Sequence, residues 1–504
     1  MTMNKFPRML KGSILAYGLV IMFMMAIIMT SIISFIANQT KYSLQTHARE
    51  QAFQIAESGI HFYRWYLAHQ VEGRTAQQIA TFWATGNPYG VATPYEVEYK
   101  DPGGDPIGKY RLEVTAPATG STIVTVKATG WTYRYPSVTR VIKVRFRRPS
   151  WSESAVLAND VMRFGSGTEV YGKIHSNQGI RFDGVAHNVV SSSVSSYDDP
   201  DHNGGVEFGV HTHVNAPPGV GVNDTYRAAE APPATVPNRT DVFMAGRAFP
   251  EAVVDFNGVL GDLSNMKAVA QAGTNNSRYF ANLTNDVGRK IILKTNGTFD
   301  TCRVASASIT GVGPTYDIAT NNGYRRASGA GTCSTCSGLC LQNYTIPTDG
   351  VIFVEDNVWL EGQISNKKVT AVAADLVGGS SPSVYIANDL TYSSYTGSDI
   401  LGVIGQQDIT IPQSSDTDLR IDGALLAQQG KVGRADYGTT DHKNSITVQG
   451  AIATNQRYGF AWTNGVQNWG YNTRNLYYDN NLLYFPPPYF PTGTQYEMDL
   501  WQEQ

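Results

Sequence analysis

An uncharged, apolar run near the start of the chain constrains the fold more than any other feature. No charged residue occurs between Lys11 and Lys41, and the apolar core from Ile14 to Ala37 is 24 residues long. About 20 helical residues cross a bilayer, and charges are costly at its centre. The run therefore predicts a transmembrane helix. Because Lys5 and Arg8 precede it, the N-terminus is expected in the cytoplasm.

Two simpler interpretations of the run are a signal peptide and a plain anchor. A secretory signal peptide has an apolar region of about 7–15 residues followed by a small-residue cleavage site. This run is longer, and the sequence FIANQTKY that follows it is a poor cleavage site. A plain single-span anchor remains open as an alternative.

The helical pattern continues beyond the apolar run. No proline occurs from Ser13 to His69, and apolar residues recur every three or four positions, as on one face of a helix. A helix of this length would extend about 85 Å. Its first half is expected in lipid and its second half against a folded domain. The stripe of the second half comprises Leu44, Ala48, Ala52, Ile55, Ala56, Gly59, Phe62, Tyr63 and Tyr66.

These residues resemble the start of a type IV pilin or pseudopilin, with a PilX-type N-terminal segment. The resemblance rests on the basic leader ending at Gly12, the apolar run, and REQAFQIAESGIHFYRWYLAH from Arg49 to His69. It implies that a prepilin peptidase removes residues 1–12 and that Ser13 becomes a methylated N-terminus. It also implies assembly with other pilin-like subunits through the helix.

One position departs from the pattern of this family. Most major pilins carry Glu at the fifth mature position, where it pairs with the N-terminal amine of a neighbouring subunit; here that position is Tyr17. Some pseudopilins at filament tips also lack this Glu. The departure favours a minor or tip subunit over a major pilin.

The composition indicates an exported, β-rich protein of more than one domain. Only 16% of the 504 residues are charged, whereas Gly (49) and Tyr (28) are abundant. The net charge of −3 provides no basic field that would attract nucleic acid, so no nucleic-acid partner is expected.

After a connector over residues 70–94, the hydrophobic period changes to two. Four alternating segments over residues 95–148, separated by short turns, predict a small antiparallel sheet beneath the helical stripe, which is also the pilin architecture. Basic residues gather near its end. They are interpreted as a solvated strand face, with a DNA-binding patch as the alternative. These residues are Arg140, Lys143, Arg145, Arg147 and Arg148.

Beyond residue 148, short β-branched runs alternate with polar pairs and glycine. The pairs recur with steps of 32, 19, 21 and 27 residues, which is typical of a β-solenoid. Residues 149–485 are therefore predicted to form a right-handed parallel β-solenoid, with an insertion at about 187–345 and a β-sandwich as the alternative. Residues 486–504 are expected to cap its end. The pairs lie at Asn357, Asp389, Asp408, Gln429 and Gln456.

Two side-chain clusters invite a chemical interpretation. The four cysteines are expected to form disulfides outside the cytoplasm, with all three pairings open and a zinc site as the rival. The histidines of YDDPDHNGGVEFGVHTHV, with neighbouring carboxylates, could surround a cation, but a polar loop is preferred and no metal or cofactor is expected. The residues are Cys302, Cys333, Cys336 and Cys340, and His202, His211, His213, Asp198, Asp199 and Asp201.

No catalytic motif occurs, and no catalytic residue is assigned. Asp356, Asp389 and Asp408 fall at comparable places in the repeat, so a membrane-anchored polysaccharide-active enzyme is one alternative. The preferred interpretation is a membrane-inserted minor or tip subunit of a type IV pilus or pseudopilus. It would display its β-rich domain outside the cell for adhesion to glycans or other surfaces.

Overall fold

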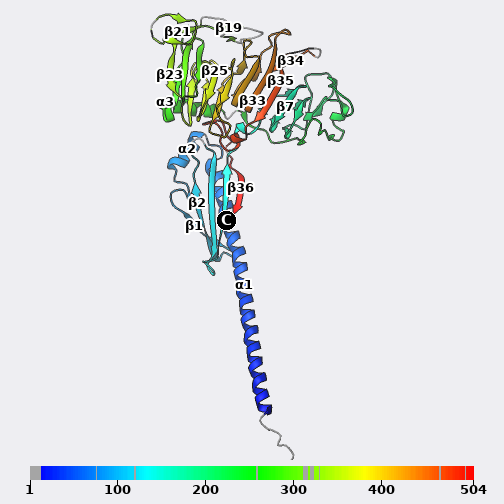
Figure 1. Ribbon diagram of the computed structural model, residues 1–504, viewed down its shortest axis with the longest axis vertical. Helices are drawn as coiled ribbons and strands as arrows, with labels where there is room; N and C mark the ends of the chain where they lie inside the picture. Colours follow the sequence, from blue (N-terminus) through cyan, green and yellow to red (C-terminus); the bar gives the residue numbers. More distant parts are fainter. Residues whose placement is uncertain are drawn as a thin grey trace, which may run out of the picture.

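A computed structural model describes residues 13–74, 76–118, 121–256, 259–309, 316–317, 323–328, 330–464, 467–493 and 495–504. It consists of a long helix, a small sheet that packs on the upper half of this helix, and a large β-rich head (Figure 1). The predictions of a long apolar helix, an antiparallel sheet and a large β-rich region are confirmed. The expected leader and its Gly12 lie outside the described residues.

Helix α1 (Ser13–Val71) has two halves with opposite surroundings. Residues 14–43 are all exposed, and in Figure 1 this part projects away from the rest of the molecule. From Ala48 onward one face is buried, at positions that follow the spacing of the sequence stripe. The buried residues are Ala48, Ala52, Ile55, Ala56, Gly59, Ile60, Tyr63, Leu67 and Val71.

The buried face of α1 lies on a five-stranded antiparallel sheet, ordered β1-β2-β3-β4-β36. Its strands alternate between buried and more exposed positions, as expected of a sheet with one covered face. Gly130 in β3 lets the helix approach closely, because a Cβ there would lie 2.3 Å from the carbonyl oxygen of Ala52. The elements are α2 (Ala76–Thr85), β1 (Tyr95–Lys100), β2 (Pro106–Thr115), β3 (Ile123–Thr132), β4 (Thr139–Arg147) and β36 (Glu497–Glu503).

Strand β36 corrects the prediction for residues 486–504. It pairs antiparallel with β4 and so completes the small sheet instead of capping the head. Its acidic residues meet the basic residues of β4: Arg145 Nη2 lies 2.5 Å from Asp499 Oδ2, and Arg140 pairs with Glu503. The basic face is therefore substantially neutralised within the molecule.

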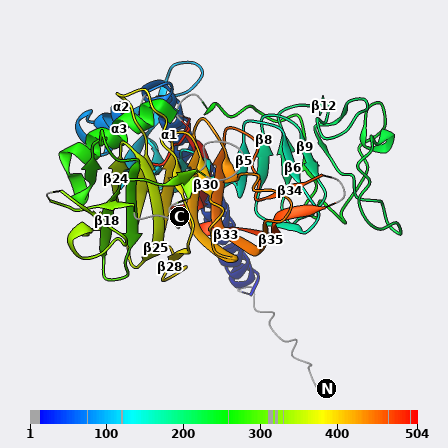
Figure 2. The same ribbon diagram turned by 90° about the horizontal axis from the view of Figure 1, so that it is seen from above.

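The head is built from parallel ladders that run along its length (Figure 2). Successive turns of the chain contribute strands to three such ladders, and consecutive strands within them pair in parallel. The first ladder contains β16 (Arg278–Phe280), β24 (Gly350–Val354), β26 (Lys368–Ala373), β29 (Ile400–Gly405), β31 (Asp418–Ala427), β33 (His442–Thr454), β5 (Val156–Ala158), β8 (Ile174–Ser176), β11 (Val190–Ser192) and β15 (Arg247–Ala248).

The other two ladders form the remaining sides, and apolar side chains fill the space between them. One contains β17 (Gly288–Leu293), β25 (Asn357–Ile364), β27 (Val384–Tyr385), β30 (Ile409–Ile411) and β32 (Val432–Arg434), with β6 (Met162–Phe164), β9 (Ile180–Phe182) and β14 (Val210–His211) as a separate sheet. The other contains the end of β25, β28 (Leu390–Tyr392), parts of β31 and β33, β35 (Asn468–Tyr478), β7 (Thr168–Tyr171) and β10 (Val185–Ala186).

The order of the strands in space differs from their order in the chain. The chain enters the head at β5, in the middle of the stack. The part of the head that it then forms, from β5 to β15, is called the arm. It then passes through α3 (Val259–Ala272) to the other end, and winds back until β33 meets β5 and β35 meets β7. We call this junction the seam.

The expected insertion at 187–345 therefore divides into separate parts. Its first part continues the ladders of the arm, whereas its last part is an antiparallel flap beside β17. The flap contains β18 (Thr298–Val304), β21 (Tyr324–Arg325), β22 (Thr332–Cys333) and β23 (Gln342–Thr345). The other short strands are β12 (Ser196–Tyr197), β13 (Glu207–Phe208), β19 (Ser308–Ile309), β20 (Tyr316–Asp317) and β34 (Ala461–Thr463).

An outer apolar layer covers one face of the first ladder. Trp151, Phe256, Leu482 and Phe490 are buried there together with one side of α3. The aromatic segment before β36 thus lies along the side of the head, where it connects the head to the small sheet.

Candidate functional site

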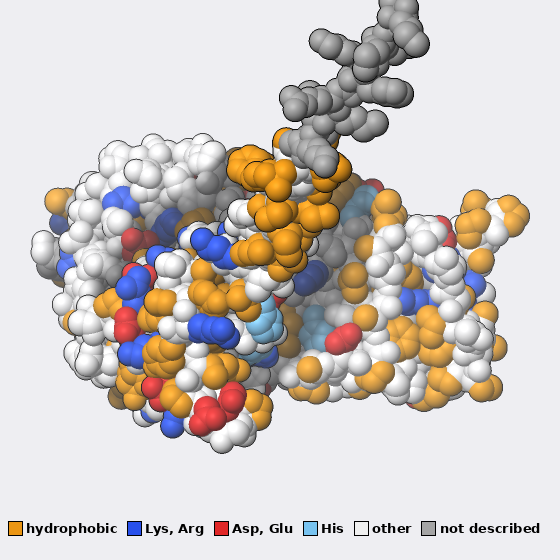
Figure 3. Space-filling view, turned by 90° about the horizontal axis from the view of Figure 1, so that it is seen from below, with side chains coloured by type: hydrophobic (Ala, Val, Ile, Leu, Met, Phe, Trp, Pro, Cys, Tyr) orange, Lys and Arg blue, Asp and Glu red, His pale blue; other side chains and the backbone are white. Residues whose placement is uncertain are grey.

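The exposed half of α1 presents a continuous apolar surface. Among the described residues, this helix alone is long and apolar enough to cross a membrane. Seen from below, the projecting helix is covered with hydrophobic side chains (Figure 3). Water does not stabilise such a surface, so it favours an apolar environment such as lipid.

The two described residues of the expected processing region lie at the start of this surface. Ser13 is the first residue of α1, and Tyr17 is 69% exposed. The side chain of Tyr17 carries no charge that could pair with an amine in lipid.

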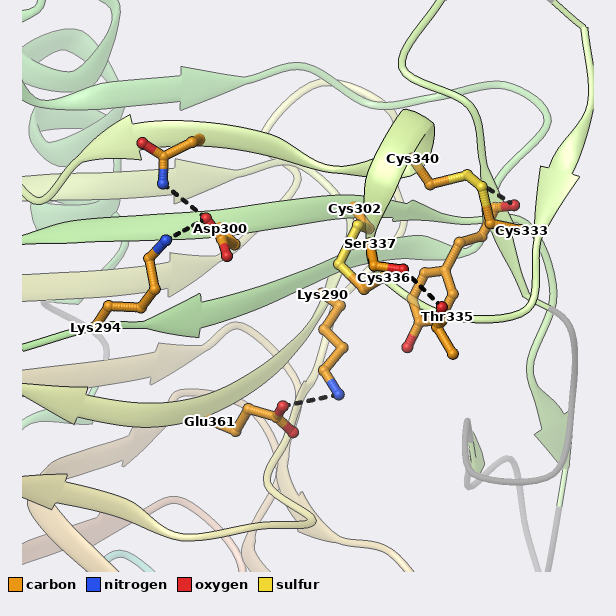
Figure 4. The surroundings of a disulfide bond; sticks show 12 residues. Lys290, Lys294, Asp300, Cys302, Cys333, Thr335, Cys336, Ser337, Cys340 and Glu361 are labelled. Atoms are coloured by element: carbon orange, nitrogen blue, oxygen red, sulfur yellow. Dashed lines mark hydrogen bonds and ion pairs between the residues drawn. A yellow bond between two sulfur atoms is a disulfide. The ribbon is translucent and has the colours of Figure 1, made fainter.

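The four cysteines form two disulfide bonds within the flap (Figure 4). Cys302 in β18 is joined to Cys336, and Cys333 in β22 is joined to Cys340. All four sulfur atoms are thereby used, so the structure has no thiolates there for zinc. The sequence left three pairings open because spacing alone cannot distinguish them.

Each of the three carboxylates of the repeat accepts a hydrogen bond from the backbone of another turn. Asp389 Oδ1 accepts a hydrogen bond from Arg420 N at 2.8 Å, and Asp408 Oδ1 accepts one from Lys431 N at 2.7 Å. Asp356 Oδ2 accepts from Leu283 N at 3.1 Å. Burial raises the pKa of Asp356 to about 6, although this hydrogen bond opposes the shift. These contacts are typical of structural turn residues.

A groove of about 680 Å³ follows the seam between the arm and the last turns of the head. Asp201 lies in it between Arg457, whose Nη2 is 2.5 Å away, and Arg163, whose Nη1 is 3.5 Å away. Trp462 also lines the groove, with the Lys431 ammonium 5.2 Å from its ring centroid. The groove combines charged groups, polar groups and an aromatic ring, as sites for polar ligands do.

A second cluster lies inside the arm, at the turn between β12 and β13 and just after β14. The side chains of Asp199, His202, Glu207, His211 and His213 each direct a ligand-type atom to one place, and these atoms all lie within 4.8 Å of one another. Every one of these side chains is at most 3% exposed.

The sequence identified part of this cluster. It grouped the three histidines with Asp198, Asp199 and Asp201, but Asp198 is exposed and Asp201 faces Arg457 in the groove. Glu207 was missed, although it alternates with His211 and His213 at even spacing, which places such residues on one side of an extended segment.

The histidines and carboxylates of this cluster shift one another's pKa values. Burial would lower the pKa of His211, but its interactions with Asp199 and Glu207 prevail and raise this pKa to about 9. Burial would likewise raise the pKa of Glu207, but the neighbouring imidazoles lower it well below its usual range.

Comparisons with known proteins add little. No protein-family model matches the chain, and no curated protein matches its sequence. Among solved structures, the competence-associated pilin ComZ from Thermus thermophilus is similar at 14% identity, over 91% of this chain and 97% of that one, with a TM-score of 0.29. A score this low does not establish a common fold, so function is inferred from the geometry of the chain itself.

Proposed function

We propose that the chain is a minor subunit of a type IV pilus or a related pseudopilus, located at the filament tip. The observation that carries this proposal is the division of α1. One continuous helix has an exposed apolar half, residues 14–43, and a second half docked on an antiparallel sheet. A plain anchor needs only the first half, whereas a subunit that assembles through its helix needs both.

Orientation and processing follow from the same helix. The basic residues before Gly12 keep the N-terminus in the cytoplasm, and the sheet and head lie on the opposite side of the membrane. A prepilin peptidase cleaves after Gly12, and Ser13 becomes the methylated N-terminus, as the PilX-type resemblance implies.

A tip position is supported by two independent features. Tyr17 lacks the carboxylate with which a subunit neutralises the amine of a neighbour. The head is also much larger than the small sheet and lies at the end of the molecule opposite the projecting helix (Figure 1). A head of this size is accommodated more readily at a filament end than between stacked subunits.

The role proposed for the head is adhesive and not catalytic. The repeat carboxylates are engaged with backbone amides, whereas the seam groove offers Trp462 and several charged groups to solvent-borne ligands such as glycans. The groove is the surface that we assign to adhesion.

The first experiment is the N-terminal sequence and mass of the mature protein from cells with and without the prepilin peptidase. A start at methylated Ser13 that requires the peptidase supports the proposal; an intact Met1 or another start overturns it. Gly12→Val should block cleavage. Gly18→Val is the matched control, because a Cβ at Gly18 meets no atom within 4 Å.

Filament position is measured separately, by labelling the head on sheared filaments in electron micrographs. Label at one end of each filament supports a tip subunit. Label distributed along the filament contradicts the tip position but supports the assembly of this chain into filaments.

A further inference from the structure

We propose that the cluster of Asp199, His202, Glu207, His211 and His213 is a structural metal site that binds one divalent transition-metal ion, Zn²⁺ by preference. The site lies in the arm of the head, far from the apolar helix, and is independent of the proposed assembly function. It reverses the sequence expectation of no metal.

The spacing of the ligand atoms fits an ion at their centre. His211 Nε2 lies 3.1 Å from Glu207 Oε2 and 3.5 Å from Asp199 Oδ2. His213 Nε2 lies 3.2 Å from Glu207 Oε1. Ligands at about 2.1 Å from a tetrahedral zinc ion are separated from one another by about 3.4 Å.

The protonation of two rings is fixed by the backbone. His213 Nδ1 lies 2.8 Å from the carbonyl oxygen of Asn223, and His211 Nδ1 lies 3.3 Å from that of Phe208. A carbonyl only accepts, so each Nδ1 carries a proton. Nε2 is then the nitrogen of each ring that faces the carboxylate oxygens, and this nitrogen, without a proton, would bind a metal ion placed between them.

Two buried polar atoms aimed into the centre lack a hydrogen-bond partner: Asp199 Oδ2 and His211 Nε2. Their side chains are 1% and 0% exposed, so water does not solvate them freely. Leaving such atoms unsatisfied is costly, and coordination to one ion would satisfy both.

The charge balance also favours a dication. The carboxylates of Asp183, Asp199 and Glu207 are fully buried here, and Arg181 is the fully buried cation beside them. Arg181 pairs with Asp183 and Asp224, which leaves Asp199 and Glu207 as the two carboxylates whose charge a divalent ion would neutralise. Three imidazoles select a transition metal over Ca²⁺ or Mg²⁺, which prefer oxygen ligands.

Five side chains offer ligand atoms here, and a tetrahedral ion bound by four of them has no open position for substrate, so the ion would be structural. It would connect the β12–β13 turn to β14 in a part of the head whose strands are only two or three residues long. The metal would thus replace the apolar ladder contacts that hold the rest of the head.

The test uses the full chain in detergent, purified with a tag that contains no histidine, stripped with EDTA and then reloaded with ZnCl₂. We expect one zinc per chain by mass spectrometry, and a melting temperature that rises by about 5 °C on reloading. His211→Ala and His202→Ala should each lose the zinc and the shift. His187→Ala is the matched control, because His187 lies in the same arm but stacks on Tyr171 outside the cluster.

His202 lies in the turn, so its alanine variant tests the site even where His211→Ala fails to fold. A wild-type chain that takes up no zinc and melts at the same temperature with and without EDTA overturns the proposal. Zinc uptake that persists unchanged in both His202→Ala and His211→Ala also overturns it, because the ion is then bound elsewhere.

Discussion

The small sheet and the head are each completed by segments that are distant in sequence, but by different physical means. At the edge of the sheet, Arg145 and Asp499 are bonded across 354 positions. At the seam of the head, Asn159 and Asn455 are bonded across 296 positions. The first junction is an outer strand that pairs with β4 through its backbone and through ion pairs near water. The second lies within a continuous ladder.

This difference concerns how much each junction contributes to stability. The side chains of Arg145 and Asp499 are 28% and 14% exposed, and ion pairs near water stabilise weakly. Val156 and Ile452 face each other across the seam and are both 0% exposed. We infer that the contacts at the seam are essential to the stability of the head. Strand β36 contributes less, and the sheet would keep its fold without it.

The largest effect is expected at the seam. Ile452→Ala should lower the free energy of unfolding of the head by about 3–4 kcal/mol, because it leaves a cavity in a fully buried ladder. Calorimetry of the full chain would show this as a loss confined to the transition of the head. Val377→Ala, at a position that is 81% exposed in the same domain, should change little. Equal effects of the two substitutions would contradict the importance of the seam.

The disulfides provide a third, covalent means of joining distant residues. Cys302 and Cys336 are 34 positions apart, whereas Cys333 and Cys340 are 7 apart. Cross-linking the longer loop removes more entropy from the unfolded chain, so Cys302→Ser with Cys336→Ser should cost about 3 kcal/mol and the shorter pair about 2 kcal/mol. Proteolysis of the flap in each double variant would measure the order. A larger loss for the shorter pair would contradict it.

The sequence predicted what depends on local periodicity. The exposed run, the buried stripe of α1 and the alternating strands β1 to β4 all follow from spacing that one segment imposes by itself. The position of β36 and the seam could not be predicted in this way, because both depend on partners hundreds of residues away. One signal was present: the basic residues of β4 and the acidic residues Glu497, Asp499 and Glu503 are complementary.

The candidate metal site shows the same limit of prediction from local sequence. The three histidines could be grouped from the sequence because they lie within a short segment. The selection of Asp199 over Asp198 and Asp201 depends on how the turn before β13 folds, and the missed ligand, Glu207, is the side chain that all three imidazoles approach.

A smaller effect is expected at the edge of the sheet. Asp499→Lys places a like charge beside Arg145 and Arg147 and should destabilise the sheet by about 1 kcal/mol, with a smaller loss in 1 M salt. Adding Arg145→Glu should restore most of it. Asp105→Lys, at the open turn between β1 and β2, is the control of equal charge change. A loss independent of salt would indicate that backbone pairing, and not charge, holds β36.

The smallest effect concerns a turn inside the head and depends on pH. Burial raises the pKa of Asp356 to about 6, above its value of about 3.9 in an unfolded chain. The folded protein therefore binds more protons than the unfolded one between about pH 4 and pH 6, and this group makes the protein less stable as the pH rises through that interval. Asp356→Asn keeps an oxygen that can accept from Leu283 N and carries no charge. Its melting temperature should match wild type at pH 4 and exceed it slightly at pH 8, by about 1–2 °C. The same difference at both pH values would show that Asp356 is not protonated in the folded state. The carboxylate of Asp356 would then resemble the ionised groups at the edge of the sheet, and not a group that is buried like the side chains of the seam.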